Sequence, residues 1–176
     1  MSQRVNLSNA TVLVFERSVA ASKIITQMLR GFGVGRIVDV ETVDAARDYV
    51  SREAVDLIVA DPAAANGDGM EFLRWLRRAK LNPNRFTPIL LVAGHTKDAL
   101  VKLARDAGAN FIVAKPLAPK TMLERILWLS RDMRTFVDAG AYVGPDRRFK
   151  QGPLPAGQRD RRGDHPAIPN ETEGEP

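Results

Sequence analysis

The seven residues Val55-Asp56-Leu57-Ile58-Val59-Ala60-Asp61 decide the fold class of this chain. Their four central apolar residues show no alternation with polar ones, which is typical of a strand buried on both faces. Strands of that kind occur in parallel sheets that are covered by helices on both sides. The stretch therefore predicts a central strand of an α/β sheet, and this strand ends in an aspartate.

Similar short apolar runs recur along the chain and alternate with longer segments of helical period. The predicted strands are Thr11–Phe15, Arg36–Val40, Asp56–Ala60, Pro88–Ala93 and Asn110–Ala114. The predicted helices are Val19–Gly31, Val43–Arg52, Gly69–Lys80, Lys97–Ala107 and Pro119–Met133. Because right-handed crossovers place helices on both faces, we expect an α/β fold with a doubly wound, five-stranded parallel sheet.

Composition excludes several classes of protein. The chain has 176 residues, of which 44% are hydrophobic and 27% charged, so it can bury a sizeable core. It has no cysteine, which excludes disulfides, thiol catalysis and thiolate metal sites. No apolar run approaches the roughly 20 residues that cross a bilayer, and the first residues lack the layout of a secretory signal. We therefore expect a cytoplasmic protein with no membrane partner.

The pattern of strands and helices stops after Met133. The remaining 43 residues hold six of the eleven prolines and six of the thirteen glycines. Such a composition favours an extended or disordered tail, so we predict a leader at 1–9, a domain at 10–133 and a tail at 134–176. The stretch 145–162 carries six basic residues against two aspartates, but a solvated basic stretch more often serves solubility, so nucleic-acid binding is not expected.

Chemistry in a doubly wound sheet takes place beyond the carboxyl ends of the strands. Polar side chains follow several of the predicted strands there, namely Glu16, Asp61, His95, Thr96 and Lys115. An aspartate can attack phosphorus when a cation neutralises the incoming oxygens, and a lysine supplies such a charge. Glu16, Asp61 and a backbone carbonyl are also the hard oxygen ligands that Mg²⁺ prefers. A buried ion pair kept for the fold is the alternative explanation for Asp61 and Lys115.

From about Thr11 to Met133 the chain resembles the receiver domain of bacterial response regulators. The resemblance is carried by five motifs in order, Val55 to Asp61, Gly67-Asp68-Gly69-Met70-Glu71-Phe72-Leu73-Arg74, Pro88-Ile89-Leu90-Leu91-Val92, Ala107-Gly108-Ala109 and Lys115-Pro116. It implies a flavodoxin-like sheet of order 2-1-3-4-5. It also implies that Asp61 accepts a phosphoryl group, that Lys115 pairs with it before a cis peptide bond to Pro116, and that the carbonyl of Ala63 binds Mg²⁺.

The departures from the family pattern are also informative. Receivers carry two adjacent acids after the first strand, whereas this chain has Phe15 in the first place and Glu16 in the second. The loss of one carboxylate predicts weakened Mg²⁺ binding. The switch hydroxyl at the end of the fourth strand is replaced by Ala93, and the aromatic switch position on the fifth strand is Ile112. These changes predict a blunted switch.

Residues 134–148, with Gly94-His95-Thr96, resemble a group of stand-alone receivers that end in Gly-Pro-Asp-Arg-Arg. No DNA-binding helix-turn-helix follows in this sequence, so we expect the output to be protein binding. Trp75, Trp128, Arg147 and Arg148 are predicted to form the partner surface, and the fourth and fifth helices could support a homodimer. The alternative for Trp128 is that the tail folds back and covers it through Phe136, Tyr142 or Phe149.

These features together predict a single-domain response regulator rather than an enzyme. It would receive phosphate on Asp61 from a histidine kinase or a phosphotransfer protein and signal by binding a downstream protein. The alternative is a pseudo-receiver, an interaction or scaffold module that works without phosphorylation.

Overall fold

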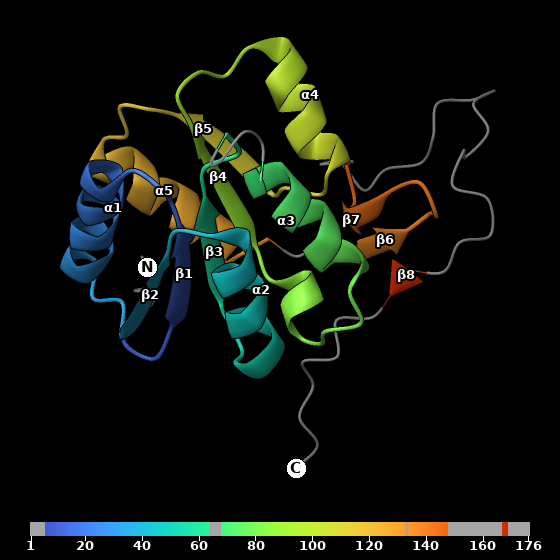
Figure 1. Ribbon diagram of the computed structural model, residues 1–176, viewed down its shortest axis with the longest axis horizontal. Coiled ribbons are helices and arrows are strands. Elements are labelled where there is room, and N and C mark those ends of the chain that lie inside the picture. Colours follow the sequence, from blue (N-terminus) through green and yellow to red (C-terminus); the bar gives the residue numbers. More distant parts are fainter. Residues whose placement is uncertain (1–5, 64–67, 133, 148–166, 169–176) are drawn as a thin grey trace.

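The computed structural model describes residues 6–63, 68–132, 134–147 and 167–168. Five strands form a parallel sheet in the order β2-β1-β3-β4-β5, which confirms the predicted fold class and strand order (Figure 1). The strands are β1 (Thr11–Phe15), β2 (Arg36–Val40), β3 (Leu57–Ala60), β4 (Ile89–Ala93) and β5 (Phe111–Ala114). The helices are α1 (Val19–Gly31), α2 (Val43–Arg52), α3 (Asp68–Arg78), α4 (Asp98–Asp106) and α5 (Pro119–Leu129), with a short 3₁₀ helix η2 (Asn84–Phe86) before β4.

The sheet is covered on both faces, as its uninterrupted apolar strands require. Every residue of β3 and β4 is buried. One hydrophobic cluster joins the sheet to α2, α3 and α4, and a second joins its other face to α1 and α5 (Figure 1). Two helix starts are fixed by side chains, since Ser18 accepts a hydrogen bond from the Ala21 amide and Thr42 accepts one from the Ala45 amide.

Asn84 of η2 connects three segments near the amino end of β3. Its side chain is buried, accepts a hydrogen bond from the Val55 amide at 2.9 Å, and donates to the carbonyls of Val50 and Glu53 at 2.7 Å each. These three bonds connect the end of α2, the start of β3 and η2. The arrangement fixes where β3 begins, and therefore where it delivers Asp61.

The first part of the predicted tail is folded against the domain. Its strands β6 (Phe136–Asp138) and β7 (Val143–Pro145) form an antiparallel hairpin, and β8 (Ala167–Ile168) pairs with the other edge of β6 (Figure 1). Phe136 is 3% exposed and packs edge-on against Phe86, with ring centroids 5.0 Å apart. Residues 134–147 of the predicted extended or disordered tail thus fold onto the domain, because a few apolar side chains find partners there. The predictions for 1–5, 148–166 and 169–176 lie outside the described residues.

Arg77 of α3 is the largest polar side chain inside the domain, with 1% exposure. Its guanidinium donates hydrogen bonds to the carbonyls of Gly108, Arg85 and Thr87 and to the Asn110 side chain, at 2.7 to 3.0 Å. It also stacks on the Phe136 ring at 4.9 Å. Burial lowers the pKa of Arg77 to about 9, so the group remains cationic at neutral pH. This one residue links α3, the start of β5 and the hairpin.

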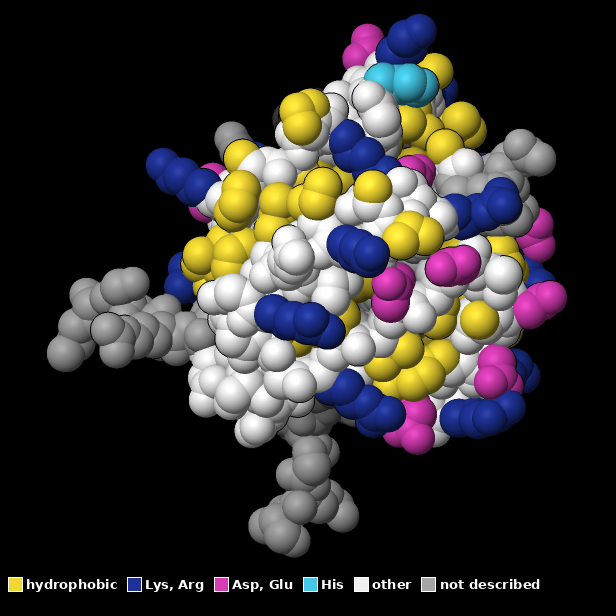
Figure 2. All heavy atoms as spheres, turned by 60° about the vertical axis from the view of Figure 1, so that its left-hand side comes forward, with side chains coloured by type: hydrophobic (Ala, Val, Ile, Leu, Met, Phe, Trp, Pro, Cys, Tyr) yellow, Lys and Arg dark blue, Asp and Glu magenta, His cyan; other side chains and the backbone are white. Residues whose placement is uncertain are grey.

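Charged side chains of both signs lie near one another on the face shown in Figure 2. Figure 2 shows Lys and Arg side chains interspersed with Asp and Glu on the face it displays, with hydrophobic side chains between them.

None of the helices in the described part of the chain has the length and apolar character needed for a membrane crossing.

Candidate functional site

Three strands deliver charged side chains to the carboxyl edge of the sheet. Glu16 follows β1, Asp61 follows β3 and Lys115 follows β5. The Lys115 ammonium donates to Asp61 Oδ2 at 2.6 Å and to Glu16 Oε2 at 2.5 Å. Parallel strands end at the same edge, so residues 16, 61 and 115 meet although they are far apart in the sequence. The structure therefore brings together the three side chains that the sequence singled out.

The two carboxylates are held firmly in place. Their side chains are only 5% exposed for Glu16 and 14% for Asp61. The free oxygen of each accepts a backbone hydrogen bond, from Ser18 N at 2.9 Å and from Ala63 N at 2.7 Å respectively. Burial opposes the charged form of Lys115, but the hydrogen bonds and charges of Asp61 and Glu16 outweigh burial and raise its pKa. The lysine is therefore a fixed cation beside Asp61.

The start of α3 lies directly on the backbone of Asp61. A Cβ atom on Gly69 would lie 2.0 Å from the Asp61 carbonyl oxygen, so no side chain fits there. Glycine lets the helix begin in contact with the peptide that carries the carboxylate. At the far side of the site, the peptide bond between Lys115 and Pro116 is cis, as the resemblance implied.

Phe15 occupies the first of the two positions where receivers carry adjacent acids, and its side chain belongs to the hydrophobic core. Its side chain is 0% exposed and packs edge-on against Phe72, with ring centroids 5.8 Å apart. Among the described residues no group of three His, Cys, Asp or Glu side chains could hold a metal ion. Glu16 and Asp61 are two hard oxygen donors with remaining lone pairs, a set that suits Mg²⁺ because this ion needs few carboxylates and keeps several waters.

The family model described as response regulator receiver domain matches residues 12–127. The chain belongs to the response regulator receiver family. The receiver is 32% identical over 127 residues to the chemotaxis protein CheY of Treponema pallidum, covering 70% of this chain and 85% of that protein. It is 29% identical over 105 residues to the KDP operon transcriptional regulatory protein KdpE of Escherichia coli, covering 60% of this chain. The aligned part spans only 44% of KdpE.

Solved structures show the same fold for this receiver. The chemotaxis protein CheY4 of Vibrio cholerae superposes with a TM-score of 0.63 and 22% identity, covering 69% of this chain and 98% of that one. The receiver domain of the sensor histidine kinase PA1611 of Pseudomonas aeruginosa superposes with a TM-score of 0.61 and 26% identity, with the same two coverages. That neighbour holds a magnesium ion in its active-site cleft.

The two predicted switch positions, Ala93 and Ile112, lie on the neighbouring strands β4 and β5. Ala93 ends β4 and is 1% exposed, beside Ala114 of β5. Ile112 is half-buried on β5 and packs against the cluster that includes α4. Neither side chain can donate a hydrogen bond to a group on Asp61. Their predicted roles as switch positions stay predictions.

The two tryptophans of the predicted partner surface are half-buried rather than exposed. Trp75 stacks on Phe72 at 6.1 Å and carries the Arg47 guanidinium above it at 5.0 Å. Trp128 packs against Phe111 at 5.6 Å, and Arg134, from the start of the predicted tail, stacks on it at 5.2 Å. The sequence left open whether the tail would cover Trp128 through Phe136, Tyr142 or Phe149; among the described residues, Arg134 is the one seen to stack on its ring.

Arg147 and Arg148 complete the predicted partner surface. Arg147 lies at the end of the hairpin, pairs with Asp106 at 3.2 Å and stacks over the Tyr142 ring at 3.8 Å. Arg148 lies outside the described residues. Sequence reasoning did not single out Arg105, and it considered Tyr142 only as a cover for Trp128. No motif marks either residue as a neighbour of Arg147, which meets Tyr142 and Asp106 only in the folded chain.

Proposed function

We propose that this receiver is a single-domain response regulator that accepts a phosphoryl group on Asp61 from a histidine kinase or a phosphotransfer protein. The observation that carries the proposal is the 2.6 Å contact between the Asp61 carboxylate and the Lys115 ammonium at the carboxyl edge of the sheet. The phosphorylated chain would then act by binding a downstream protein in the cytoplasm. The chain would catalyse no reaction on another substrate.

The chemistry requires a nucleophile and positive charge at one point. An Asp61 carboxylate oxygen attacks the phosphorus of phosphohistidine, so the P–N bond breaks as a P–O bond forms. The imidazole leaves with the electron pair and takes up a proton. The Lys115 ammonium already touches the carboxylate and supplies charge for the phosphoryl oxygens. Its raised pKa keeps that charge in place at neutral pH.

Magnesium would be held by Glu16, Asp61 and the Ala63 carbonyl. A bound Mg²⁺ ion would add charge neutralisation at the phosphoryl oxygens. The backbone amide of Ala63 donates to Asp61, which keeps this residue beside the carboxylate. Because Phe15 replaces one carboxylate, we propose weaker Mg²⁺ binding than two adjacent acids would give.

The test is the intact mass of the chain after incubation with acetyl phosphate and Mg²⁺. We expect the mass of one phosphoryl group to be added to the wild type and not to Asp61→Asn. A matched control is Asp56→Asn, because Asp56 precedes β3 at the end opposite Asp61 and, among the hydrogen bonds described, its carboxylate accepts only from the Thr11 amide. Absence of an adduct on folded wild-type protein would refute phosphorylation, and the pseudo-receiver would then be the better description.

A further inference from the structure

A cleft opens at the amino edge of the sheet, the edge opposite Asp61. It is lined by Asp56, Pro88 and Asn110, which precede β3, β4 and β5 respectively. Its volume of about 540 Å³ lies within the ~300–1,000 Å³ that small-molecule pockets usually have. The hairpin forms one of its walls, through residues beyond the range 12–127 that matches the family. The cleft is therefore separate from the phosphorylation site, and the C-terminal segment completes it.

The interior of the cleft is built largely from rings. Phe86 of η2 and Phe136 of β6 meet edge-on at 5.0 Å between ring centroids, which joins the domain to the hairpin. Flat apolar molecules pack well on aromatic and proline rings, because such rings lose little conformational freedom on binding. The five rings that line the cleft are Pro83, Phe86, Pro88, Phe136 and Pro145. The cleft therefore suits a ligand with a flat apolar body.

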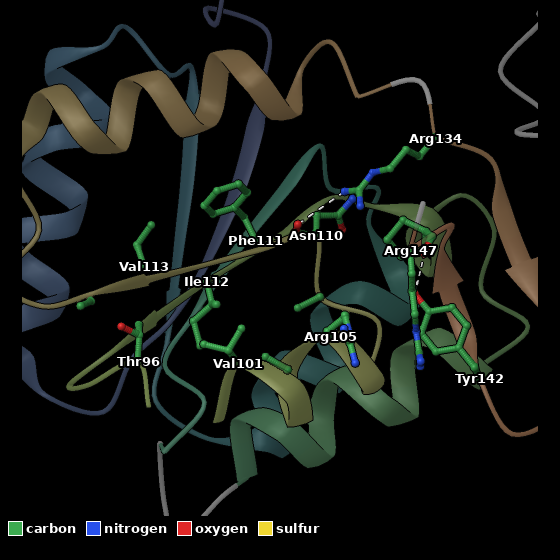
Figure 3. Close-up of a pocket in the computed structure, with 14 residues that line it drawn as sticks. Thr96, Val101, Arg105, Asn110, Phe111, Ile112, Val113, Arg134, Tyr142 and Arg147 are labelled. Carbon is green, nitrogen blue, oxygen red and sulfur yellow. Dashed lines mark hydrogen bonds between the residues drawn. The ribbon is translucent and has the colours of Figure 1, made fainter. Parts of the chain in front are cut away.

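Most polar groups in the walls are already bonded to one another. The Asp132 carboxylate accepts hydrogen bonds from Arg134 at 2.6 and 2.8 Å and from the Asn110 side chain at 3.3 Å. Figure 3 shows that the Arg134 guanidinium also reaches the carbonyl of Asn110, at 3.4 Å. The Thr87 hydroxyl donates to the Val55 carbonyl at 2.7 Å. These bonds fix the shape of the cleft without a ligand.

The carboxylate of Asp56 differs from these groups because it has no cationic partner. One of its oxygens accepts a hydrogen bond from the Thr11 amide at 2.7 Å, whereas the described part of the chain offers no hydrogen bond to the other oxygen and no ion pair. The residue is exposed, so a ligand can reach it. The charged residues of the lining are Asp56, Asp132 and Arg134, which leaves one negative charge in excess. The charge of the cleft therefore favours a cation.

We propose that this cleft binds a small organic cation in which a planar charged group is attached to a flat apolar ring. The charged group pairs with the Asp56 carboxylate, since an amidinium or guanidinium can donate two parallel hydrogen bonds to a carboxylate. The ring lies against the proline and phenylalanine rings of the walls. The proposal goes beyond the proposed function and does not depend on phosphorylation, because Asp61 lies at the opposite edge of the sheet.

The test uses benzamidine as the probe and the full chain without a phosphodonor. Isothermal titration calorimetry should give a Kd in the millimolar range or tighter, roughly what a ligand of this size reaches. Amide chemical-shift changes in two-dimensional NMR should be largest around Val55, Asp56 and Phe136. Benzamide has the same shape but no charge, and it should bind at least about tenfold more weakly.

Three variants separate binding at the cleft from folding. Asp56→Asn removes the charge but keeps an oxygen for the Thr11 amide, and it should weaken benzamidine at least about tenfold. Ala54→Arg adds a cation at an exposed position of the lining and should have the same effect. Asp44→Asn makes the same charge change at an exposed position of α2 and should leave the Kd unchanged.

Three results would overturn the proposal. They are equal affinity for benzamidine and benzamide, an Asp56→Asn variant that binds like the wild type, and chemical-shift changes centred on Glu16 and Asp61. A wild-type chain that binds no benzamidine overturns it as well, and binding that then appears in Arg4→Gln would assign the cleft to the chain's own first residues.

The mass measurement on Asp61 is independent of this titration. A chain that binds benzamidine at the cleft but takes up no phosphoryl group would refute the proposed function alone. A chain that is phosphorylated but binds no benzamidine would refute the cleft proposal alone.

Discussion

Replacing Phe136 with alanine tests whether the hairpin is part of the folded domain. Phe136 is 3% exposed, so exposing its buried apolar surface to water lowers the free energy of unfolding by about 1.5 to 3 kcal/mol. The edge-on contact with Phe86 adds about 0.5 to 1.5 kcal/mol. The Arg77 guanidinium above the ring adds about 0.5 kcal/mol or more. We expect a loss of roughly 3 kcal/mol, at the lower limit for Phe→Ala in cores, because a hairpin at the periphery can move inward.

The assay is equilibrium unfolding in urea, monitored by tryptophan fluorescence. For a chain of this length, roughly 3 kcal/mol also lowers Tm by about 6 to 12 °C. The control is Val137→Ala, since Val137 is the next residue of β6, is half-buried and points to the other side of the strand. We expect it to cost about 1 kcal/mol or less. A Phe136→Ala variant as stable as this control would show that the hairpin does not pack on the domain.

Three further substitutions test other contacts. Asn84→Ala removes three buried hydrogen bonds and should cost about 2 to 4 kcal/mol in urea unfolding. Burial opposes the charged form of Asp132, but the hydrogen bonds from Arg134 and Asn110 and the charge of Arg134 outweigh burial and lower the pKa of Asp132. The stability that Asp132 contributes is therefore present above pH 3.8 and lost as the pH falls through the folded pKa. Asp132→Asn should flatten the acid limb of the curve of unfolding free energy against pH. The raised pKa of Lys115 gives stability below pH 10.5 that is lost as the pH rises through the folded pKa, so Lys115→Met should flatten the alkaline limb.

Each of these variants has an exposed counterpart. Asn9→Ala, Asp44→Asn and Lys80→Met change the same residue types at exposed positions. An Asn84→Ala variant that loses less than about 1 kcal/mol would contradict the hydrogen-bond argument. For the two titrating residues, pH–stability curves that keep the wild-type slope would show that the ion pairs contribute nothing to folding.

Local sequence signals account for most of the sheet and helices. The predicted bounds of β1, β2, α1 and α2 agree with the structure at both ends, because apolar runs and capping residues mark them. β3 begins one residue later than predicted, since Asp56 uses its carboxylate to accept a hydrogen bond from the Thr11 amide. The fifth helix ends at Leu129 instead of Met133. Just after it, the Asp132 carboxylate accepts hydrogen bonds from the side chains of Arg134 and Asn110.

The contacts that sequence reasoning could not find join residues far apart in the chain. In the sequence, Arg77 has the pattern of a polar residue on a surface helix. Its guanidinium is nevertheless buried, because its hydrogen-bond acceptors lie between residues 85 and 110. The hairpin depends on Phe136 and Val143, whose apolar character is diluted by the polar and glycine-rich residues around them. Strand topology, by contrast, allowed the meeting of Glu16, Asp61 and Lys115 to be predicted. Their roles in phosphoryl transfer stay predictions.

The packing of Phe15 against Phe72 limits which substitutions can supply a second acid. The first of the two acid positions is filled here by an aromatic ring that belongs to the core. An acid at position 15 places a carboxylate, or a void, in a region where Phe15 is 0% exposed. Phe72 would have to change first or at the same time. An engineered receiver with both acids therefore needs a redesigned core around position 72, and a single substitution at position 15 is expected to cost stability.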